Sequence, residues 1–270
     1  MPMQGISYRF SHAIVRRVGT SITDGLRAVD RGAPDCSHFR AEHGRYIRAL
    51  ERAGVGVTVL DELDAHPDSV FIEDAALCLP EGIVMMRPGA PSRMREATLL
   101  SATLADLGHR VIPNETDGTI DGGDVLITDS SVMVGLSERT DRAGFDWLAS
   151  VLGAWGYDVQ AVQTPGEVLH FKSDCCVIGS DTVLATERLA DAACFEPFRV
   201  LTVPRGEEAA ANTVRLNDTV LMPAGFPATE RLLADEGLDV EVLSVSQAAL
   251  LDGGLSCMSL RLPAVARPAG

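Results

Sequence analysis

The sequence predicts an α/β fold in which five similar units close into a ring. One order of elements (strand, turn, strand, helix, strand) recurs along the 270 residues. A hairpin precedes each helix, and the last predicted strand finds a partner only if the first strand pairs with it. Units of about 40–55 residues that repeat in this way are typical of radial architectures. An open α/β sheet with irregular hairpins is the alternative, which alternating strands and helices alone would favour.

The first complete unit begins with an apolar run that predicts a strand over residues 69–78. A Pro-Glu-Gly turn at 80–82 leads into a second strand at 83–87. A helix is predicted over 92–107 and a strand at 110–112. The helix carries an apolar face made of Leu99, Leu100, Leu104 and Leu107.

Three further units follow the same order. The second has strands at 124–128, 131–136 and 158–162 and a helix at 140–154; the third has strands at 175–179, 182–186 and 199–203 and a short helix at 187–194; the fourth has strands at 213–216, 219–222 and 239–244 and a helix at 228–236. The fifth unit is split between the chain ends, with strands at 255–262, 11–17 and 55–60 and a helix at 35–53. We therefore expect residues 1–270 to form a single domain, closed by its two termini, with residues 263–270 as a flexible tail.

Charge and composition narrow the classes of function. A formal net charge of −15 disfavours nucleic acid and anionic membrane surfaces as partners and favours a cationic one. An acidic surface that only keeps the protein soluble is the alternative. The sequence has no secretory signal and no run long enough to cross a membrane, so we expect a cytoplasmic location. The six cysteines include no C-x-x-C pair and the six histidines form no metal-binding pattern, so no structural or catalytic transition metal is expected.

Cys257 is the candidate nucleophile. It follows Asp252-Gly253-Gly254 near the start of the last predicted strand, and glycines let a backbone approach a ligand closely. Most cysteines are buried and inert, so position alone supports this interpretation only weakly. A reactive thiolate needs a base or a positive neighbour, and a cationic substrate can supply that charge.

His170 is the candidate acid and base. It enters the third unit where Asp121 enters the second, so the repeat would bring both residues to one axis. An imidazole can protonate a leaving amine and then activate water. A lone histidine is more often an ordinary polar residue, and Asp121-Gly122-Gly123 could be a plain turn.

Three acids mark the start of the first complete unit, Asp68, Glu73 and Asp74. Neighbouring strand residues point to opposite faces, so at least one of Glu73 and Asp74 is expected to face inward. A buried carboxylate is costly without a partner, and a guanidinium pairs with carboxylates through two parallel hydrogen bonds. A solvated edge strand is the alternative.

Two arginines and one loop complete the set of candidates. Arg93 and Arg139 each follow the second strand of a unit and could bind a carboxylate of the substrate, but arginines at helix starts are also common on surfaces. The loop Asp24-Gly25-Leu26 could act as a lid.

Together these residues resemble the dimethylarginine dimethylaminohydrolases of the guanidino-modifying, or pentein, superfamily. The resemblance implies a five-bladed α/β-propeller of ββαβ modules. It also implies hydrolysis of Nω-methylated arginine to citrulline and methylamine or dimethylamine, with no cofactor. The similar segments occur in family order, at Asp24–Leu26, Pro67–Asp74, Arg87–Arg93, Ile120–Asp124, Gly135–Thr140, Leu169–Ser173, Met222–Gly225 and Asp252–Ser259.

The resemblance also implies a role for each candidate. Cys257 would attack the guanidinium carbon to form a covalent thiouronium intermediate. His170 would protonate the leaving amine and then activate water, and Asp121 would orient it. The substrate-binding set would comprise Asp74 and Glu73 at the guanidinium, Asp68 at the α-amino group, Arg93 and Arg139 at the α-carboxylate, Leu26 in the lid and the backbone carbonyl of Leu251.

Two alternatives remain open at this point. One is another guanidino hydrolase or deiminase that acts on arginine itself. Arginine deiminases carry Arg-Asp where this chain has Glu73-Asp74 and contain an inserted helical domain, so both features favour a methylarginine substrate. The other is a non-catalytic guanidino-binding protein, which the presence of Cys257, His170 and Asp121 disfavours. A homodimer also remains open, since two-fold dimers are the commonest soluble oligomers.

Overall fold

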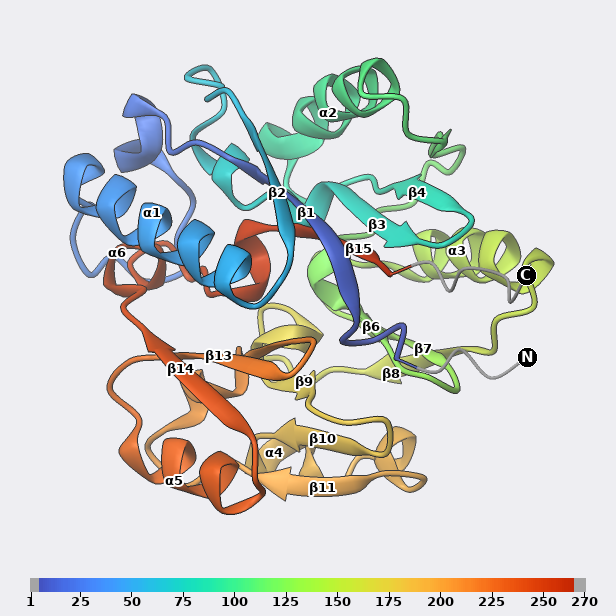
Figure 1. Cartoon of the computed structure of the whole chain (residues 1–270). Coiled ribbons are helices and arrows are strands. Elements are labelled where there is room, and N and C mark those ends of the chain that lie inside the picture. Colours follow the sequence, from blue (N-terminus) through green and yellow to red (C-terminus); the bar gives the residue numbers. More distant parts are fainter. Residues whose placement is uncertain (1–4, 265–270) are drawn as a thin grey trace, which may run out of the picture.

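A computed structural model describes residues 5–264 of the chain. Five three-stranded sheets surround a central axis, and the longer helices lie on the periphery (Figure 1). In each sheet the middle strand is antiparallel to one neighbour and parallel to the other, which the order strand, turn, strand, helix, strand produces. The predicted five-bladed α/β-propeller is confirmed.

Four of the five modules are continuous in sequence. Module 1 contains β3 (Ala76–Leu79), β4 (Gly82–Met85), α2 (Met94–Asp106) and β5 (Val111–Ile112); module 2 contains β6 (Val125–Ile127), β7 (Val132–Leu136), α3 (Arg142–Ala154) and β8 (Val159–Gln163). Module 3 contains β9 (Cys175–Val177), β10 (Thr182–Ala185), α4 (Glu187–Ala190), η7 (Ala193–Phe195) and β11 (Arg199–Thr202); module 4 contains β12 (Val214–Leu216), β13 (Thr219–Pro223), α5 (Pro227–Asp235) and β14 (Asp239–Leu243).

The fifth module joins the two ends of the described chain, as predicted. Its middle strand β1 (Phe10–Arg16) pairs with β15 (Leu260–Pro263) and with β2 (Gly56–Leu60), and α1 (Cys36–Arg52) covers it. Pro263 pairs with Phe10, and the Ala264 amide donates to the carbonyl of Arg9. Pro263 and Ala264, predicted as part of a tail, are therefore held to the N-terminal segment of the sheet, and residues 265–270 of that predicted tail lie outside the described range.

A short 3-10 turn precedes the first strand of every module; we call these five segments the entrance turns. They are η3 (Ile72–Ala75), η5 (Gly122–Asp124), η6 (Phe171–Ser173), η8 (Glu208–Ala211) and η9 (Ser256–Met258). The remaining short elements are η1 (Thr20–Asp24), η2 (Pro67–Val70), η4 (Pro91–Arg93) and α6 (Ser246–Ala249).

The entrance turns correct two of the predicted strands. Residues 69–78 lie mostly in η2 and η3 and only then enter β3, and residues 255–262 form η9 before β15. Cys257 thus lies in a turn ahead of the last strand. Because a buried turn and a buried strand are both rich in apolar residues, hydrophobicity alone does not separate them.

The core lies between the sheets and their helices. In α2 the buried face contains Leu100 and Leu104, as predicted, but Leu107 is exposed at the helix end. Asp35 caps α1 by accepting a hydrogen bond from the His38 amide, which satisfies one of the free amides of the first turn. Within residues 5–264 no helix is long and apolar enough to cross a membrane.

Candidate active site

A pocket of about 250 Å³ lies where entrance turns of three modules meet the loop that follows η1. It brings together residues that are more than 200 positions apart in the chain, including Leu26 and Cys257. The sequence-predicted residues that line it are Leu26, Asp68, Asp74, Arg93, Arg139, His170, Leu251 and Cys257.

Cys257 lies in η9 and is partly buried, with the carboxylates of Glu73 and Asp74 near its sulfur. Burial raises the pKa of the Cys257 thiol to about 12, and the carboxylates of Glu73 and Asp74 contribute to the rise. The thiol is therefore protonated in the free protein at neutral pH. A cation bound beside it would favour the thiolate.

His170 and Asp121 each lie immediately before an entrance turn, His170 before η6 and Asp121 before η5. The His170 Nε2 atom is 2.8 Å from Asp121 Oδ2 and 3.9 Å from Asp74 Oδ1. Burial would lower the pKa of His170, but Asp74 and the hydrogen bond to Asp121 outweigh it and raise the pKa to about 9. At neutral pH the imidazole is thus a proton donor.

In the Asp121-Gly122-Gly123-Asp124 segment, the two acids and Gly123 each have an identifiable structural role. Asp121 is fully buried and fixed, since its Oδ1 atom accepts the Gly89 amide at 2.7 Å. Gly123 donates its amide to Asp74 Oδ1 at 3.1 Å, and a Cβ atom there would overlap the His170 ring. Asp124 points away and holds the loop after β7 through Ser137 and Thr140.

Asp74 forms a buried ion cluster with Arg93 and Glu96, which we call the outer cluster. Arg93 Nη1 pairs with Asp74 Oδ2, and Arg93 Nε and Nη2 donate to Glu96 Oε2 at 3.1 and 3.0 Å. Burial opposes ionisation of Asp74, yet His170 and Arg93 hold its pKa below the usual value. For Glu96, burial dominates over Arg93 and raises the pKa to about 7.

The two predicted arginines differ in their availability. Arg93 also donates to the carbonyls of Phe71 (2.7 Å) and Asp68 (3.3 Å), so its guanidinium is fully engaged. Arg139 lies in the loop after β7, half-buried, and within residues 5–264 its guanidinium takes part in no hydrogen bond or ion pair. Arg139 is thus the arginine free to meet a ligand.

The loop after η1 covers the pocket. The Leu26 amide donates to Asp68 Oδ1 at 2.9 Å, and the Ala28 amide donates to Asp252 Oδ2 at 2.5 Å. Leu26 remains 39% exposed at the pocket mouth, whereas Leu251 is buried in its wall. Hydrogen bonds to these two carboxylates therefore hold the loop over the pocket.

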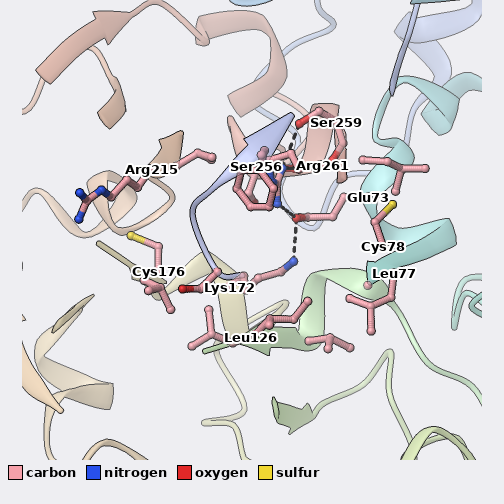
Figure 2. Close-up of a pocket in the computed structure, with 18 of the residues that line it drawn as sticks. Glu73, Leu77, Cys78, Leu126, Lys172, Cys176, Arg215, Ser256, Ser259 and Arg261 are labelled. Carbon is pink, nitrogen blue, oxygen red and sulfur yellow. Dashed lines mark hydrogen bonds and ion pairs between the residues drawn. The ribbon is translucent and has the colours of Figure 1, made fainter. Parts of the chain in front are cut away.

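Glu73 is the one predicted residue placed on another side of η3. Its Oε1 atom accepts from Lys172 Nζ at 2.7 Å and from Arg261 Nη2, and it lines an interior cavity instead of the pocket (Figure 2). Direct contact of Glu73 with a ligand in the pocket is therefore not supported by its position.

Several pocket residues were not singled out from the sequence. Phe71 forms part of the wall, and a Cβ atom at Gly253 would overlap its ring, so the glycine permits this close packing. Asp252 adopts a positive φ of 56°, a backbone strain that sequence inspection does not reveal. Other lining residues that sequence reasoning missed are Arg27, Ala28, Glu138 and Leu169.

One group of side chains has the donor atoms of a metal site. Ligand atoms of Asp74, Asp121 and His170 lie within 4.8 Å of one another. A protonated imidazole has no lone pair to offer a metal, and the raised pKa of His170 keeps it protonated at neutral pH. The arrangement suits proton transfer and cation binding through carboxylates better than metal coordination.

Comparison with known proteins gives consistent matches over most of the chain. The family model described as N,N dimethylarginine dimethylhydrolase, eukaryotic, matches residues 35–193. The N(G),N(G)-dimethylarginine dimethylaminohydrolase of Pseudomonas aeruginosa is 34% identical over 257 residues, which is 93% of this chain and 99% of the relative. The protein of the same name from Streptomyces coelicolor is 35% identical over 252 residues, 93% of this chain and 96% of the relative.

A solved structure extends the similarity to three dimensions. A cysteine-to-serine variant of the Pseudomonas aeruginosa protein, complexed with citrulline, matches with a TM-score of 0.90 and 33% identity. The match covers 94% of this chain and 100% of that chain. With the family model, the curated relatives and the shared fold in agreement, this chain belongs to the dimethylarginine dimethylaminohydrolase family.

Proposed function

We propose that the protein hydrolyses Nω-methylated L-arginines to citrulline and methylamine or dimethylamine through a covalent intermediate on Cys257. The observation that carries the proposal is the convergence of Cys257, His170 and Asp74 in one pocket, with the fully buried Asp121 hydrogen-bonded to His170. The relatives that share this fold carry the corresponding activity in their names, and one of them binds citrulline.

The pocket can hold each part of a methylarginine. The guanidinium would lie at Asp74, beside Cys257, where a carboxylate can accept its N–H donors. Asp68 would bind the α-amino group and Arg139 the α-carboxylate. Arg93 supports this arrangement by holding Asp74, and Leu26 with the loop after η1 would exclude water from the closed site.

In the first half-reaction, the cationic substrate favours release of the Cys257 proton to solvent, and the thiolate sulfur attacks the guanidinium carbon. The tetrahedral adduct collapses when His170 protonates the leaving nitrogen from the ring nitrogen that is not hydrogen-bonded to Asp121, the bond from carbon to the leaving nitrogen breaks, and dimethylamine leaves. A thiouronium remains on the sulfur. The hydrogen bond from His170 to Asp121 keeps the imidazole oriented during the transfer.

In the second half-reaction, the now neutral His170 accepts a proton from water while the oxygen attacks the thiouronium carbon. The C–S bond then breaks as the hydroxyl proton of the adduct passes to the sulfur, so that citrulline and the free Cys257 thiol form. The sum is substrate plus one water to citrulline plus dimethylamine. Each proton that His170 donates is replaced by one from water, so the imidazole is unchanged after a cycle.

Product analysis tests the proposal. Purified protein incubated with asymmetric dimethylarginine should release citrulline and dimethylamine in equal amounts, and Cys257→Ser should release neither. Ammonia from arginine at a comparable kcat/KM would instead indicate a deiminase. Activity that survives in Cys257→Ser would contradict the mechanism, and activity removed by EDTA and restored by a divalent metal would contradict the absence of a metal.

The setting of the reaction is part of the proposal. All six cysteines are free thiols, which fits a reducing compartment such as the cytoplasm. A free amino-acid derivative as substrate requires neither nucleic acid nor a membrane. Light scattering of the purified protein would decide between a monomer and the homodimer that remains open.

A further inference from the structure

A second buried ion cluster lies beneath the pocket, on the interior side of η3; we call it the inner cluster. It consists of Glu73, Lys172 and Arg261, with both cations bound to the same carboxylate oxygen. Figure 2 shows the three side chains meeting at the wall of a cavity of about 100 Å³. Among residues 5–264 none lines both this cavity and the pocket, so the inner cluster lies outside the pocket in which the substrate would bind.

Arg261 connects this cluster to the nucleophile. Its Nη1 atom donates to the carbonyl of Ser256 at 2.8 Å and to the carbonyl and Oγ atom of Ser259 at 3.2 and 3.0 Å. Ser256 precedes Cys257 within η9, and Ser259 is the first residue after this turn. The other arm of the same guanidinium holds Glu73 on η3, which also carries Asp74.

We propose that Arg261 is a positioning residue for Cys257, which fixes the nucleophile turn against η3 and shares with Lys172 the neutralisation of Glu73. The inference rests on the proposed function, since Cys257 is the group positioned. Two properties of Arg261 support it, one geometric and one electrostatic.

The geometric property is the planar fork of the guanidinium. One Nη atom reaches the carbonyls around Cys257 while the other reaches Glu73, and a lysine ammonium cannot span both sets of acceptors in the same way. The far side of η9 is held independently, because Asn212 accepts the Ser256 amide at 3.0 Å. Arg261 thus restrains η9 from the interior while Asn212 restrains it from module 4.

The electrostatic property concerns the cost of forming the thiolate. Glu73 is 4% exposed and disfavours a negative charge on Cys257. The two cations on its Oε1 atom give the inner cluster an excess of positive charge that offsets that effect, and loss of Arg261 would remove this excess and leave Glu73 balanced by Lys172 alone. The charged or titratable groups around Cys257 are Glu73 and Asp74 on η3, Tyr46 on α1, His170 and Lys172 at η6, Arg261 on β15 and Asp252 in the pocket wall.

The test measures alkylation of Cys257 by iodoacetamide as a function of pH, alongside kcat and KM for asymmetric dimethylarginine. Modification is followed on the peptide that contains Cys257, because Cys36 and Cys194 are also partly exposed. The variants are Arg261→Met and Arg261→Lys. Arg215→Met is the matched control, because Arg215 lines the same cavity but donates to the carbonyls of Ile178 and Asn217, away from η9.

In Arg261→Met we expect Cys257 to be alkylated about tenfold more slowly at a fixed pH below 9, because less thiolate is present. We expect kcat to fall by about 30-fold, with KM within about twofold of the wild type. Arg261→Lys should restore the alkylation profile but only part of kcat, and Arg215→Met should change neither. Wild-type alkylation and kcat in Arg261→Met would overturn the proposal.

A double variant separates charge from fold. In Arg261→Met combined with Glu73→Gln, the negative charge of Glu73 is removed as well, and Lys172 restores the net charge that the cluster has in the wild type. The alkylation rate should therefore return to the wild-type value although kcat stays low. An alkylation rate as slow as in Arg261→Met would overturn the electrostatic part. If Arg261→Met does not fold, Arg261→Lys and the double variant carry the test. Because alkylation requires no turnover, this experiment is informative even if methylarginine is not the substrate.

Discussion

The outer and inner clusters lie on opposite sides of the same short turn and have opposite charge balance. The outer cluster places two carboxylates, Asp74 and Glu96, on one guanidinium, Arg93. The inner cluster places two cations on the single carboxylate of Glu73. Excess negative charge thus lies on the side where a guanidinium substrate would bind, and excess positive charge lies behind the nucleophile.

Two neighbouring residues therefore have different tasks in the same buried turn. Asp74 lines the pocket and is available to a cationic ligand, whereas Glu73 is held by side chains from two other modules and organises the interior. Buried charge is tolerated in both places because each carboxylate has a cationic partner. A change of charge on the outer side should affect substrate binding, and a change on the inner side should affect the nucleophile.

The largest effect is expected from a comparison of Asp74→Asn with Glu73→Gln. Loss of the Asp74 charge removes a partner of Arg93, of His170 and of the substrate, so kcat/KM should fall on the order of a thousandfold with a raised KM. Glu73→Gln should stay within about tenfold of the wild type and leave KM unchanged. Steady-state kinetics with asymmetric dimethylarginine decide this, and an equal rise of KM in both variants would refute the division of tasks.

A smaller effect is expected at Arg139. Since Arg93 is engaged in the outer cluster, Arg139→Gln should raise KM for methylarginine about 30-fold through loss of its charged hydrogen bonds to the α-carboxylate. A substrate analogue without the carboxylate should lose nothing in the same variant. Arg142→Gln is a suitable control because Arg142 is exposed and, in the part of the chain that the structure describes, contacts Asp146 and the Phe145 ring on α3, away from the pocket. An equal loss for both substrates would argue against carboxylate binding.

The smallest effect concerns Glu96, the second acid of the outer cluster, and is a change in the free energy of unfolding with pH. Folding raises the pKa of Glu96 from 4.5 to about 7, so the native state binds this proton more tightly than the unfolded state. The resulting stabilisation is complete below pH 4.5 and is lost as the pH rises through about 7. Gln is neutral at every pH, so the Glu96→Gln variant does not lose this stabilisation. Between pH 5 and pH 8 the unfolding free energy of the wild type should therefore fall by on the order of 2 kcal/mol relative to that of Glu96→Gln.

Thermal or urea unfolding at both pH values measures this difference. The exposed Glu230 provides the control, because Glu230→Gln should follow the wild type at both pH values. A difference between Glu96→Gln and the wild type that is independent of pH would mean that Glu96 keeps its charge when buried.

Much of the fold and of the pocket could be predicted because the modules repeat. His170 and Asp121 occupy equivalent positions before successive modules, so the repeat predicted that they lie close together, as the structure shows. The last strand had no other partner in the sequence pattern, so its pairing with β1 could also be predicted. The direction of Glu73 could not be predicted in this way. The chain there forms a 3-10 turn, and a strand pattern does not say which side of the turn faces the substrate.

Long-range ion pairs account for the rest of what the sequence did not reveal. Arg261 pairs with Glu73 across 188 positions of the chain, and Arg93 pairs with Asp74 across 19. A single cation in a strand gives no sign of its partner, because the contact depends on the closure of the ring. The engagement of Arg93 and the role inferred for Arg261 both required the three-dimensional arrangement.

Detection of a covalent intermediate on Cys257 tests the central claim most directly. Wild-type protein mixed with excess asymmetric dimethylarginine is quenched in acid during steady state, digested, and analysed by mass spectrometry. The peptide containing Cys257 should gain the mass of the substrate less dimethylamine, and the adduct should disappear once the substrate is consumed. Steady turnover with an unmodified Cys257 peptide, or with the adduct on another residue, would contradict nucleophilic catalysis by this thiol.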